Sequence, residues 1–428
     1  MNNFLRKYKV GDNSLLYELK NGMRVIFTPT LRSQLVYCGF LINVGSRNEN
    51  ESTNGMAHFI EHSVFKGSHK RHSYQILNRI EAVGGELNAY TTREKTFYYT
   101  STLRKYLHRS VELLVDLIFN PKFPAAELEK EKKVIIEEIE MYEDSPEESI
   151  YDDFTARLFH NSSLSHNILG TKKTVNKFTK TDVINYWSAH YIPQNCIFSL
   201  VGTITERQVE NIIEKYFYNQ ESKTASISEN NMPDYNRFQV QKRKSFQQVH
   251  VITGNRALSV HEPRRYALSL VNNILGGDWM SSRLNMNLRE KNAYAYNISS
   301  GFNTYSDTGS FVIQFGTDSK YLNGCMDIIN QELSKMCDEK ISPVLLNKAK
   351  RQLESQYAFY RENHSYMMQV NARNIADYGK LITRNEYLEA IRKINSSDIL
   401  AVCNEVFDKN KLSILIYSKE QNMNFSYF

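Results

Sequence analysis

Two stretches of the chain repeat one pattern 216 residues apart (398 − 182): Asp182–Val201, DVINYWSAHYIPQNCIFSLV, and Asp398–Tyr417, DILAVCNEVFDKNKLSILIY. Each stretch has the pattern of a helix, a turn and a short apolar strand. Tyr191 and Phe407 occupy the same place in the two copies. The repeat predicts two copies of one fold, each ending in this helix and strand. The alternative is that two terminal segments resemble each other by coincidence.

The first half shows further helix and strand patterns. Short apolar runs bounded by turn residues predict strands near residues 23–28, 34–44, 96–102 and 196–201. Longer helical patterns occupy residues 53–65, 73–83, 103–118, 124–143, 147–160 and 181–190. Ser145 as N-cap, Pro146 in the first turn and Glu148 at the third helical position mark one helix start. Helices interleaved with paired strands indicate an α+β or mixed α/β fold, not a pure barrel or bundle.

A linker is predicted near the middle of the chain. Residues Asn219–Asn236 (NQESKTASISENNMPDYN) lose periodicity and are rich in Ser, Asn, Glu and Lys. We expect a first domain over residues 1–220, a linker over 221–236 and a second domain over 237–428. A length of 428 residues suits two or three domains, each large enough to bury a core.

The composition excludes several classes of protein. With 41% hydrophobic residues and only 18 Gly and 8 Pro, the chain is neither disordered nor collagen-like. The net charge of +6 comes from 53 basic and 47 acidic residues that are largely interspersed. The densest basic cluster, Lys242–Lys244, is too short to be read as a nucleic-acid surface. We therefore expect no nucleic-acid partner.

The apolar runs and the cysteines suggest a location. The longest apolar run, Leu35–Val44, has the length of a strand, not of a membrane span. Met1–Lys20 is interrupted by charges and lacks the apolar stretch of a signal peptide. The five cysteines are scattered without metal-site spacing, which favours buried thiols in a reducing compartment. We expect a soluble cytoplasmic protein with no membrane partner.

The strongest chemical signal is His58-Phe59-Ile60-Glu61-His62, an HxxEH pattern. On a helix, His58 and His62 stand one turn apart on one face, so both imidazoles can reach one zinc ion at about 2.0–2.1 Å. Glu61 lies three residues after His58, on the same side, close enough to act on a water at the metal. This order of residues is the inverzincin signature.

A third ligand is available on the predicted helix of residues 124–143. Glu131, Val134 and Glu138 share one stripe, whereas Glu137 points about 100° away. A glutamate in line with an apolar residue is a natural inward ligand, and a catalytic zinc needs three protein ligands. The alternative is an ordinary solvated Glu/Lys helix.

The chain resembles the M16 metallopeptidases, a family that includes mitochondrial processing peptidases, pitrilysin and insulin-degrading enzyme. The resemblance rests on four segments in the family's order, spread over both halves: NGMAHFIEHSVFKGS (Asn54–Ser68), GGELNAYTTREKTFYYT (Gly84–Thr100), EKKVIIEEIEMYEDSP (Glu131–Pro146) and GGDWMSSRLNMNLREKNAYAY (Gly276–Tyr296). It implies two homologous domains of the LuxS/MPP-like metallohydrolase fold, each a mixed, largely antiparallel sheet covered by helices. The length matches the short, dimer-forming branch.

The resemblance assigns roles to individual residues. It implies that the metal is Zn²⁺ and that its ligands are His58, His62 and Glu138. Glu61 becomes the general base, and Glu131 the supporting acid. Substrate would pair antiparallel with an edge strand formed by Asn88, Ala89 and Tyr90, and the second domain would supply Arg289 and Tyr296 to face the zinc.

Two features depart from the family pattern or limit it. Asp278 stands in a turn that is often all glycine in the family, which concerns the shape of that loop. The second half has no HxxEH at Leu270–Leu284, so one zinc per chain is expected.

The function implied is a zinc-dependent endopeptidase that cuts peptides or unfolded polypeptide inside a chamber closed by two chains. Since this chain keeps both the zinc set and the Arg/Tyr pair, we expect a homodimer, with a degenerate partner chain as the alternative. The competing functions are a non-catalytic structural subunit and a peptide-binding module. The acidic stretch Glu140–Asp153 has two readings, a patch for basic substrate residues or a solvated helix start.

Overall fold

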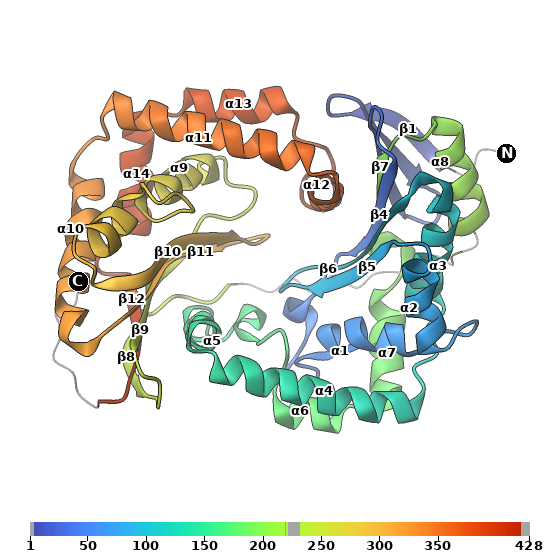
Figure 1. The fold of residues 1–428 in the computed structure, drawn as a ribbon, viewed down its shortest axis with the longest axis horizontal. Helices are drawn as coiled ribbons and strands as arrows, with labels where there is room; N and C mark the ends of the chain where they lie inside the picture. The colour runs from blue at the N-terminus through green and yellow to red at the C-terminus, as the bar shows by residue number, and fades with distance from the viewer. Residues whose placement is uncertain (1–3, 219, 221–231, 421–428) are drawn as a thin grey trace. The chain divides into compact units, whose positions relative to one another are not determined.

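The structure is a computed structural model that describes residues 4–218, 220 and 232–420. It contains two compact units, shown as ribbons in Figure 1. The first comprises Met1–Ile139, His166–Asn230 and Ala358–Arg384, and the second comprises Glu140–Ser165, Asn231–Tyr357 and Asn385–Phe428. Each unit therefore includes a segment from the other half of the chain.

The first unit is built on a seven-stranded sheet in the order β1-β2-β3-β7-β4-β6-β5. Strand β7 is buried along its whole length, pairing in parallel with β3 and antiparallel with β4. All other neighbours are antiparallel. The strands are β1 (Phe4–Val10), β2 (Ser14–Leu19), β3 (Arg24–Pro29), β4 (Leu35–Ile42), β5 (Glu86–Thr91), β6 (Thr96–Leu103) and β7 (Cys196–Gly202).

Helices cover both faces of this sheet. On one face Phe40 of β4 packs edge-on against Phe119 at the end of α3, with ring centroids 5.8 Å apart. On the other face Leu41 and Ile197 pack against Met368 of α12, a helix from the second half of the chain. The helices of this unit are α1 (Met56–Ser63), α2 (Ser73–Glu81), α3 (Leu107–Phe119), α4 (Ala125–Asp144, which continues into the second unit), α6 (Lys172–Lys177), α7 (Lys180–His190), α8 (Glu206–Ile212) and α12 (His364–Tyr378).

The second unit has a five-stranded sheet in the order β10-β11-β9-β12-β8. Its strands are β8 (Gln239–Arg243), β9 (Val249–Ala257), β10 (Ala295–Thr304), β11 (Gly309–Thr317) and β12 (Ser413–Ser418). One face forms the larger core with α9 (Arg265–Leu275), α10 (Leu322–Asp338) and α14 (Ser396–Val406). The unit also contains most of α11 (Pro343–Glu362) and α13 (Arg384–Lys393).

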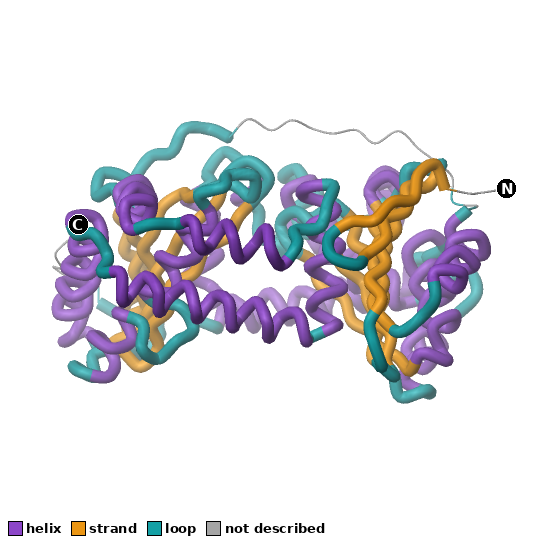
Figure 2. The backbone as a smooth tube through the Cα atoms, turned by 90° about the horizontal axis from the view of Figure 1, so that it is seen from above, coloured by secondary structure: helices purple, strands orange, loops and turns teal. Residues whose placement is uncertain are grey.

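The opposite face of the second sheet is covered by α5 (Pro146–Leu158), a helix from the first half of the chain. Ile150, Phe154 and Leu158 form one stripe at four-residue spacing and pack on Ile252 and Leu415. Figure 2 shows the strands of each unit gathered together, with helices beside them. Helices α5 and α12 are thus exchanged between the two halves.

The two sheets share one topology. Reading β3-β7-β4-β6-β5 against β8-β12-β9-β11-β10, the second strand of each set is parallel to the first and antiparallel to the third. Helix α14 begins 216 residues after α7 (396 − 180), and Tyr191 and Phe407 are the C-caps of these two helices. The predicted α+β class and the repeated helix–strand pattern are confirmed.

The predicted elements mostly match the structure. The helix start at Pro146 is right, although the Ser145 side chain makes no capping hydrogen bond. In the first half of the chain, strands β1 and β2 and helices α6 and α8 were not predicted; β1 is rich in Lys and Arg, and the two helices are short. In the second half, only the final helix and strand were predicted. Most of the predicted linker, residues 221–231, lies outside the described residues, and 232–236 form neither helix nor strand. The proposed domain boundaries stay a prediction.

The five cysteines were expected to be buried thiols, and the structure agrees for four of them. The five thiols are free, and all but Cys337 are buried. Burial raises the pKa of the Cys38 thiol to about 12. None of the helices in the described part of the chain is long and apolar enough to cross a membrane.

Candidate metal centre

Helix α1 starts at a backbone position that requires glycine. Gly55 is its N-cap with φ of 94°, in the left-handed region. The carboxylate of Glu49, which is 5% exposed, accepts hydrogen bonds from the N–H groups of Gly55 (2.7 Å) and Ala57 (2.8 Å). These bonds satisfy donors that the first turn of a helix leaves unpaired, and they hold the start of α1 in the interior.

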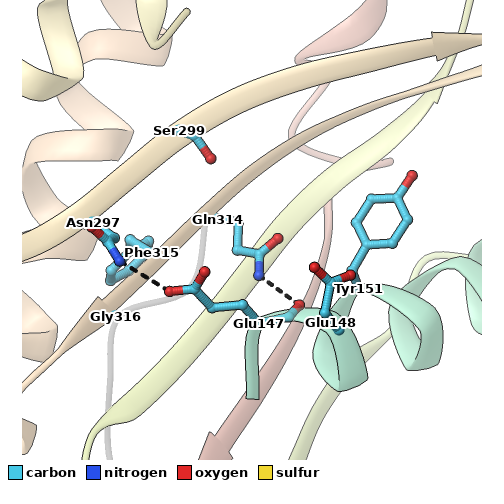
Figure 3. Close-up of a pocket in the computed structure, with 8 residues that line it drawn as sticks. All are labelled: Glu147, Glu148, Tyr151, Asn297, Ser299, Gln314, Phe315 and Gly316. Atoms are coloured by element: carbon cyan, nitrogen blue, oxygen red, sulfur yellow. Dashed lines mark hydrogen bonds between the residues drawn. The ribbon is translucent and has the colours of Figure 1, made fainter. Parts of the chain in front are cut away.

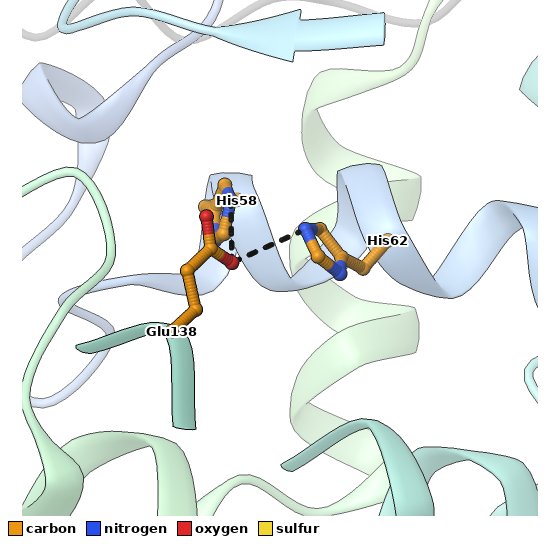
Figure 4. A group of neighbouring side chains, drawn as sticks. All are labelled: His58, His62 and Glu138. Carbon is orange, nitrogen blue, oxygen red and sulfur yellow. Dashed lines mark ion pairs between the residues drawn. The ribbon is translucent and has the colours of Figure 1, made fainter. Parts of the chain in front are cut away.

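His58 and His62 lie on the face of α1 that meets α4. Their ring centroids are 4.5 Å apart. Glu138 reaches across from α4, and its Oε2 lies 3.8 Å from Nε2 of His58 and 3.6 Å from Nε2 of His62 (Figure 4). Of the predicted stripe on residues 124–143, Glu131 is buried and Glu138 partly buried, whereas Val134 is 46% exposed; Glu137 is exposed as well.

The two histidines differ in their proton affinity. Burial lowers the pKa of His58 to about 3, so His58 is neutral at pH 7 and has a lone pair for a metal. Burial alone would also lower the pKa of His62. A hydrogen bond with Glu131 and the nearby charges of Glu61 and Glu138 outweigh burial and raise it.

Glu131 orients His62 from behind. Its Oε1 lies 2.9 Å from Nδ1 of His62, and its Oε2 lies 2.7 Å from Nζ of Lys66. A carboxylate on Nδ1 directs the Nε2 lone pair outward and makes the imidazole a better ligand. Burial raises the pKa of Glu131, but the hydrogen bonds from His62 and Lys66 outweigh burial and hold this pKa below its usual value.

Glu61 is buried next to the two histidines, with 8% of its surface exposed. Burial raises the pKa of its carboxyl group, while a hydrogen bond from the Thr91 hydroxyl at 2.6 Å acts in the opposite direction. A carboxylate of raised proton affinity beside a metal site suits a group that accepts and returns a proton.

The donor set fits a zinc ion. The three ligand atoms offered by His58, His62 and Glu138 all lie within 4.8 Å of one another, and no other such cluster occurs in the described ranges. Tetrahedral zinc with bonds of about 2.0–2.2 Å places its ligand atoms about 3.3 Å apart. The observed 3.6 and 3.8 Å need only a small closure. Nε2 is the ring nitrogen of His58 that faces Glu138, and Nδ1 is buried without a hydrogen-bond partner. Three protein ligands leave a fourth position for water.

The segment predicted to hold substrate lies in β5. This strand is at one edge of the first sheet and pairs only with β6, where Asn88 faces Tyr99 and Tyr90 faces Phe97. Its free edge carries unpaired backbone donors and acceptors, which an extended peptide can use.

Arg289 and Tyr296 belong to the second unit. Arg289 lies in the π-helical turn Asn285–Glu290, and Tyr296, which is 74% exposed, lies in β10. The guanidinium carbon of Arg289 is 5.5 Å from the centre of the Tyr296 ring. The structure thus brings this predicted pair together, and Asp278 is exposed in the segment after α9.

The acidic stretch Glu140–Asp153 spans the end of α4 and most of α5. Asp153 is paired with Lys242 and accepts a hydrogen bond from the Tyr417 hydroxyl at 2.5 Å. Glu147 and Glu148 instead line a polar pocket of about 340 Å³ against β10 and β11 (Figure 3). There Asn297 donates a hydrogen bond to the Glu147 carboxylate at 3.1 Å.

Three residues that contact this centre were not singled out in the sequence: Glu49, Lys66 and Thr91. Lys66 follows His62 by one helical turn, which was a usable signal. Thr91 follows Ala89 by two residues and so shares its face of the strand. Glu49 offered no local pattern.

Comparison with families and sequences gives a consistent result. A family model described as Insulinase (Peptidase family M16) matches residues 24–172, and one described as Peptidase M16 inactive domain matches residues 177–353. An uncharacterized zinc protease of Rickettsia felis is 32% identical over 95% of this chain and 98% of that protein. The uncharacterized zinc protease YmxG of Bacillus subtilis is 31% identical over 94% of this chain and 97% of that protein.

A more distant relative and two solved structures extend the comparison. A probable mitochondrial-processing peptidase subunit beta of Arabidopsis thaliana is 27% identical over 92% of this chain and 76% of that protein. A protease from Helicobacter pylori has a TM-score of 0.86 at 21% identity, and an M16 inactive domain protein from Pseudomonas fluorescens has a TM-score of 0.89 at 17%. Each covers 96% of this chain and 100% of the other. At these identities the two structures show a shared fold alone.

Proposed function

The chain belongs to peptidase family M16, and from that premise we propose that it is a zinc-dependent endopeptidase acting on peptides or unfolded polypeptide segments. The observation that carries the proposal is the convergence of His58, His62 and Glu138 beside the buried carboxylate of Glu61. A structural subunit would need neither the metal ligands nor an acid placed next to them.

His58, His62 and Glu138 would hold one zinc per chain through Nε2, Nε2 and a carboxylate oxygen. Bound zinc supplies a Lewis acid and lowers the pKa of a coordinated water. Glu131 keeps His62 in the tautomer and orientation that present Nε2.

Glu61 would be the general acid–base group. Its carboxylate takes a proton from the attacking water and then donates it to the leaving amine. The burial that raises the pKa of Glu61 favours both halves of this transfer, because it brings the proton affinity of the carboxylate closer to that of the groups it serves.

Substrate would bind as an added strand along β5, at Asn88, Ala89 and Tyr90. Backbone pairing reads no side chains, so it suits an enzyme that accepts varied sequences. Arg289 and Tyr296 would donate hydrogen bonds to the substrate carbonyl and to the oxyanion that forms from it.

The substrate class has a further element that we propose with this function. The pocket lined by Glu147 and Glu148 is polar and acidic, so it suits a lysine or arginine side chain. Replacement of Glu148 by Gln should slow cleavage of arginine-containing peptides more than of arginine-free ones, and more at low salt. Equal effects on both peptides would favour a solvated helix start instead.

Assembly and location complete the proposal. Two like chains would close a chamber around the site in the cytoplasm, with a degenerate M16 partner as the alternative. Light scattering of the purified chain should give a mass near twice 49.9 kDa. A stable monomer would contradict the homodimer.

The deciding experiment compares Glu61→Gln with wild-type enzyme on a peptide library read by mass spectrometry. We expect turnover only in the wild type, and zinc near one per chain in both. His58→Gln should lose the metal, whereas Glu137→Gln, on the exposed side of α4, is the matched control and should keep both metal and activity.

Two outcomes would overturn the assignment. Turnover by Glu61→Gln would remove Glu61 from the role of base. Zinc-loaded wild type that binds peptides and cuts none of them would favour a peptide-binding module.

A further inference from the structure

The side chain of Thr91 connects the edge strand β5 to the buried acid of α1. Its hydroxyl donates to Oε2 of Glu61 at 2.6 Å, a short bond of the kind formed to an ionised carboxylate. Thr91 is the last residue of β5, and Glu61 is 30 residues earlier in the chain. No other described residue donates a hydrogen bond to this carboxylate.

The single proton of the Thr91 hydroxyl is committed to Glu61. The hydroxyl of Thr96 is 3.4 Å away. Thr96 in turn donates to the backbone carbonyl of Val44 at 2.9 Å and is 1% exposed. Because Thr96 has an acceptor of its own, it holds its place beside Thr91 without competing for Glu61.

The bond leaves one carboxylate oxygen engaged and the other free. A carboxylate rotates about its last torsion with only a weak preference, so an untethered Glu61 would sample several orientations. Anchoring Oε2 to the strand fixes the plane of the group and directs Oε1 away from the anchor. Proton transfer depends steeply on such alignment.

The strand that carries Thr91 is the one with a free edge. Leu87, Ala89 and Thr91 alternate along β5 and point to the same face, the face toward α1 and α2. A peptide paired with β5 takes its register from this backbone. The same strand therefore positions a paired peptide and, through Thr91, the acid that would act on it.

We propose that Thr91 is a positioning residue that holds the Glu61 carboxylate in register with the substrate-binding edge of β5. The inference rests on the proposed peptidase function. It adds a residue to which that function assigns no role. Thr91 is not among the three residues that would hold the metal; it acts through Glu61.

The test compares three variants with wild type. Thr91→Val is nearly isosteric and removes only the hydroxyl, and Thr91→Ser keeps it. Thr102→Val, in the neighbouring strand β6, is the matched control, because the Thr102 hydroxyl is buried and bonded to Ser110 (3.0 Å), not to Glu61. Each variant is assayed for kcat and KM on a peptide that wild type cleaves, for zinc content and for thermal midpoint.

We expect Thr91→Val to lower kcat about 10- to 100-fold, the loss of one charge-assisted hydrogen bond, with KM and zinc content unchanged. Thr91→Ser should restore kcat to within about threefold of wild type, and Thr102→Val should leave kcat unchanged. If Thr91→Val fails to fold, the ratio of kcat between Thr91→Ser and Thr91→Ala isolates the hydroxyl instead and should again be about 10 or more.

Three results would overturn the inference: kcat of Thr91→Val equal to wild type, a loss confined to KM or to zinc content, or a Thr91→Ser variant as slow as Thr91→Val (or, if Thr91→Val fails to fold, as slow as Thr91→Ala). All of these presuppose an active wild type. An inactive wild type would refute the peptidase proposal itself, so the two failures are distinguishable.

Discussion

Replacing Gly55 by alanine should disturb the metal centre from one turn away. Gly55 has φ of 94°, and an added Cβ would lie 2.7 Å from both the Cα of Gly170 and the carbonyl oxygen of Leu169. Gly170 is equally restricted, since its own Cβ would lie 2.5 Å from the carbonyl oxygen of Asn54. These contacts are with backbone atoms, which cannot rotate away as a flexible side chain could.

The loss of unfolding free energy in Gly55→Ala has two parts, and a second glycine, Gly84, allows them to be measured separately. An L-residue in the left-handed region costs about 1–2 kcal/mol, and forcing extra volume against packed atoms adds about 1–3 kcal/mol. Gly84 has φ of 70° with nothing within 4 Å of its missing Cβ, so Gly84→Ala carries the first cost alone. Gly55→Ala should therefore lose about 2–5 kcal/mol of unfolding free energy, against about 1–2 kcal/mol for Gly84→Ala.

The displacement should also reach the ligands. Gly55 lies three residues before His58, and relief of the clash requires α1 to move relative to the segment at Gly170. We expect zinc affinity, measured by competition with a chromophoric chelator, to fall at least about tenfold in Gly55→Ala and to stay at the wild-type value in Gly84→Ala. The reasoning fails if denaturant unfolding shows equal costs for the two variants, or if Gly55→Ala keeps full zinc affinity.

Three further predictions concern the same unit. Glu131→Gln should weaken zinc binding about 10- to 100-fold in a chelator competition, because His62 loses its ionised partner, while Glu137→Gln should leave it unchanged. In the metal-free protein the raised pKa of His62 adds stability that is fully present below about pH 6.5, the unperturbed value, and is lost as pH rises through the higher folded value. Unfolding curves between pH 6 and 9 should therefore show a smaller decline in Glu131→Gln, and an identical decline would contradict this. Asn371→Leu, which removes a buried hydrogen bond to Thr28 (2.9 Å), should cost about 1–3 kcal/mol in denaturant unfolding, and an unchanged midpoint would show that α12 does not depend on that bond.

Local patterns were sufficient for many elements of the first half of the chain. Helix α4 and helix α5 were predicted to within two residues at each end, because their periodicity and the Ser-Pro-Glu-Glu start are encoded in consecutive residues. The face of α4 that carries Glu138 was predicted from its alignment with Val134, which is 46% exposed, so the pattern was only partly right there. Strand β1 was missed because an edge strand that carries Arg6, Lys7 and Lys9 among its seven residues has little apolar pattern to detect.

Contacts between distant segments were beyond local patterns. The exchange of α5 and α12 between the two halves depends on which sheet each apolar helix face packs against. Several helices have apolar faces of similar composition, so the sequence does not say which sheet each one covers. The cap that Glu49 provides for α1 is similar: it comes from a loop, and nothing in its neighbours distinguishes it from other acidic residues.

The sequence by itself placed His58 and His62 together, since i, i+4 spacing on a helix puts them on one face whatever the surroundings, and it predicted a duplicated fold. Only the tertiary structure decided how those groups are held. It brings Glu131 to Nδ1 of His62 across 69 residues and Thr91 to Glu61 across 30, and it pairs Lys66 with Glu131. Such bonds form only when separate helices and strands have packed, so they follow from the burial of the whole unit and not from any one segment.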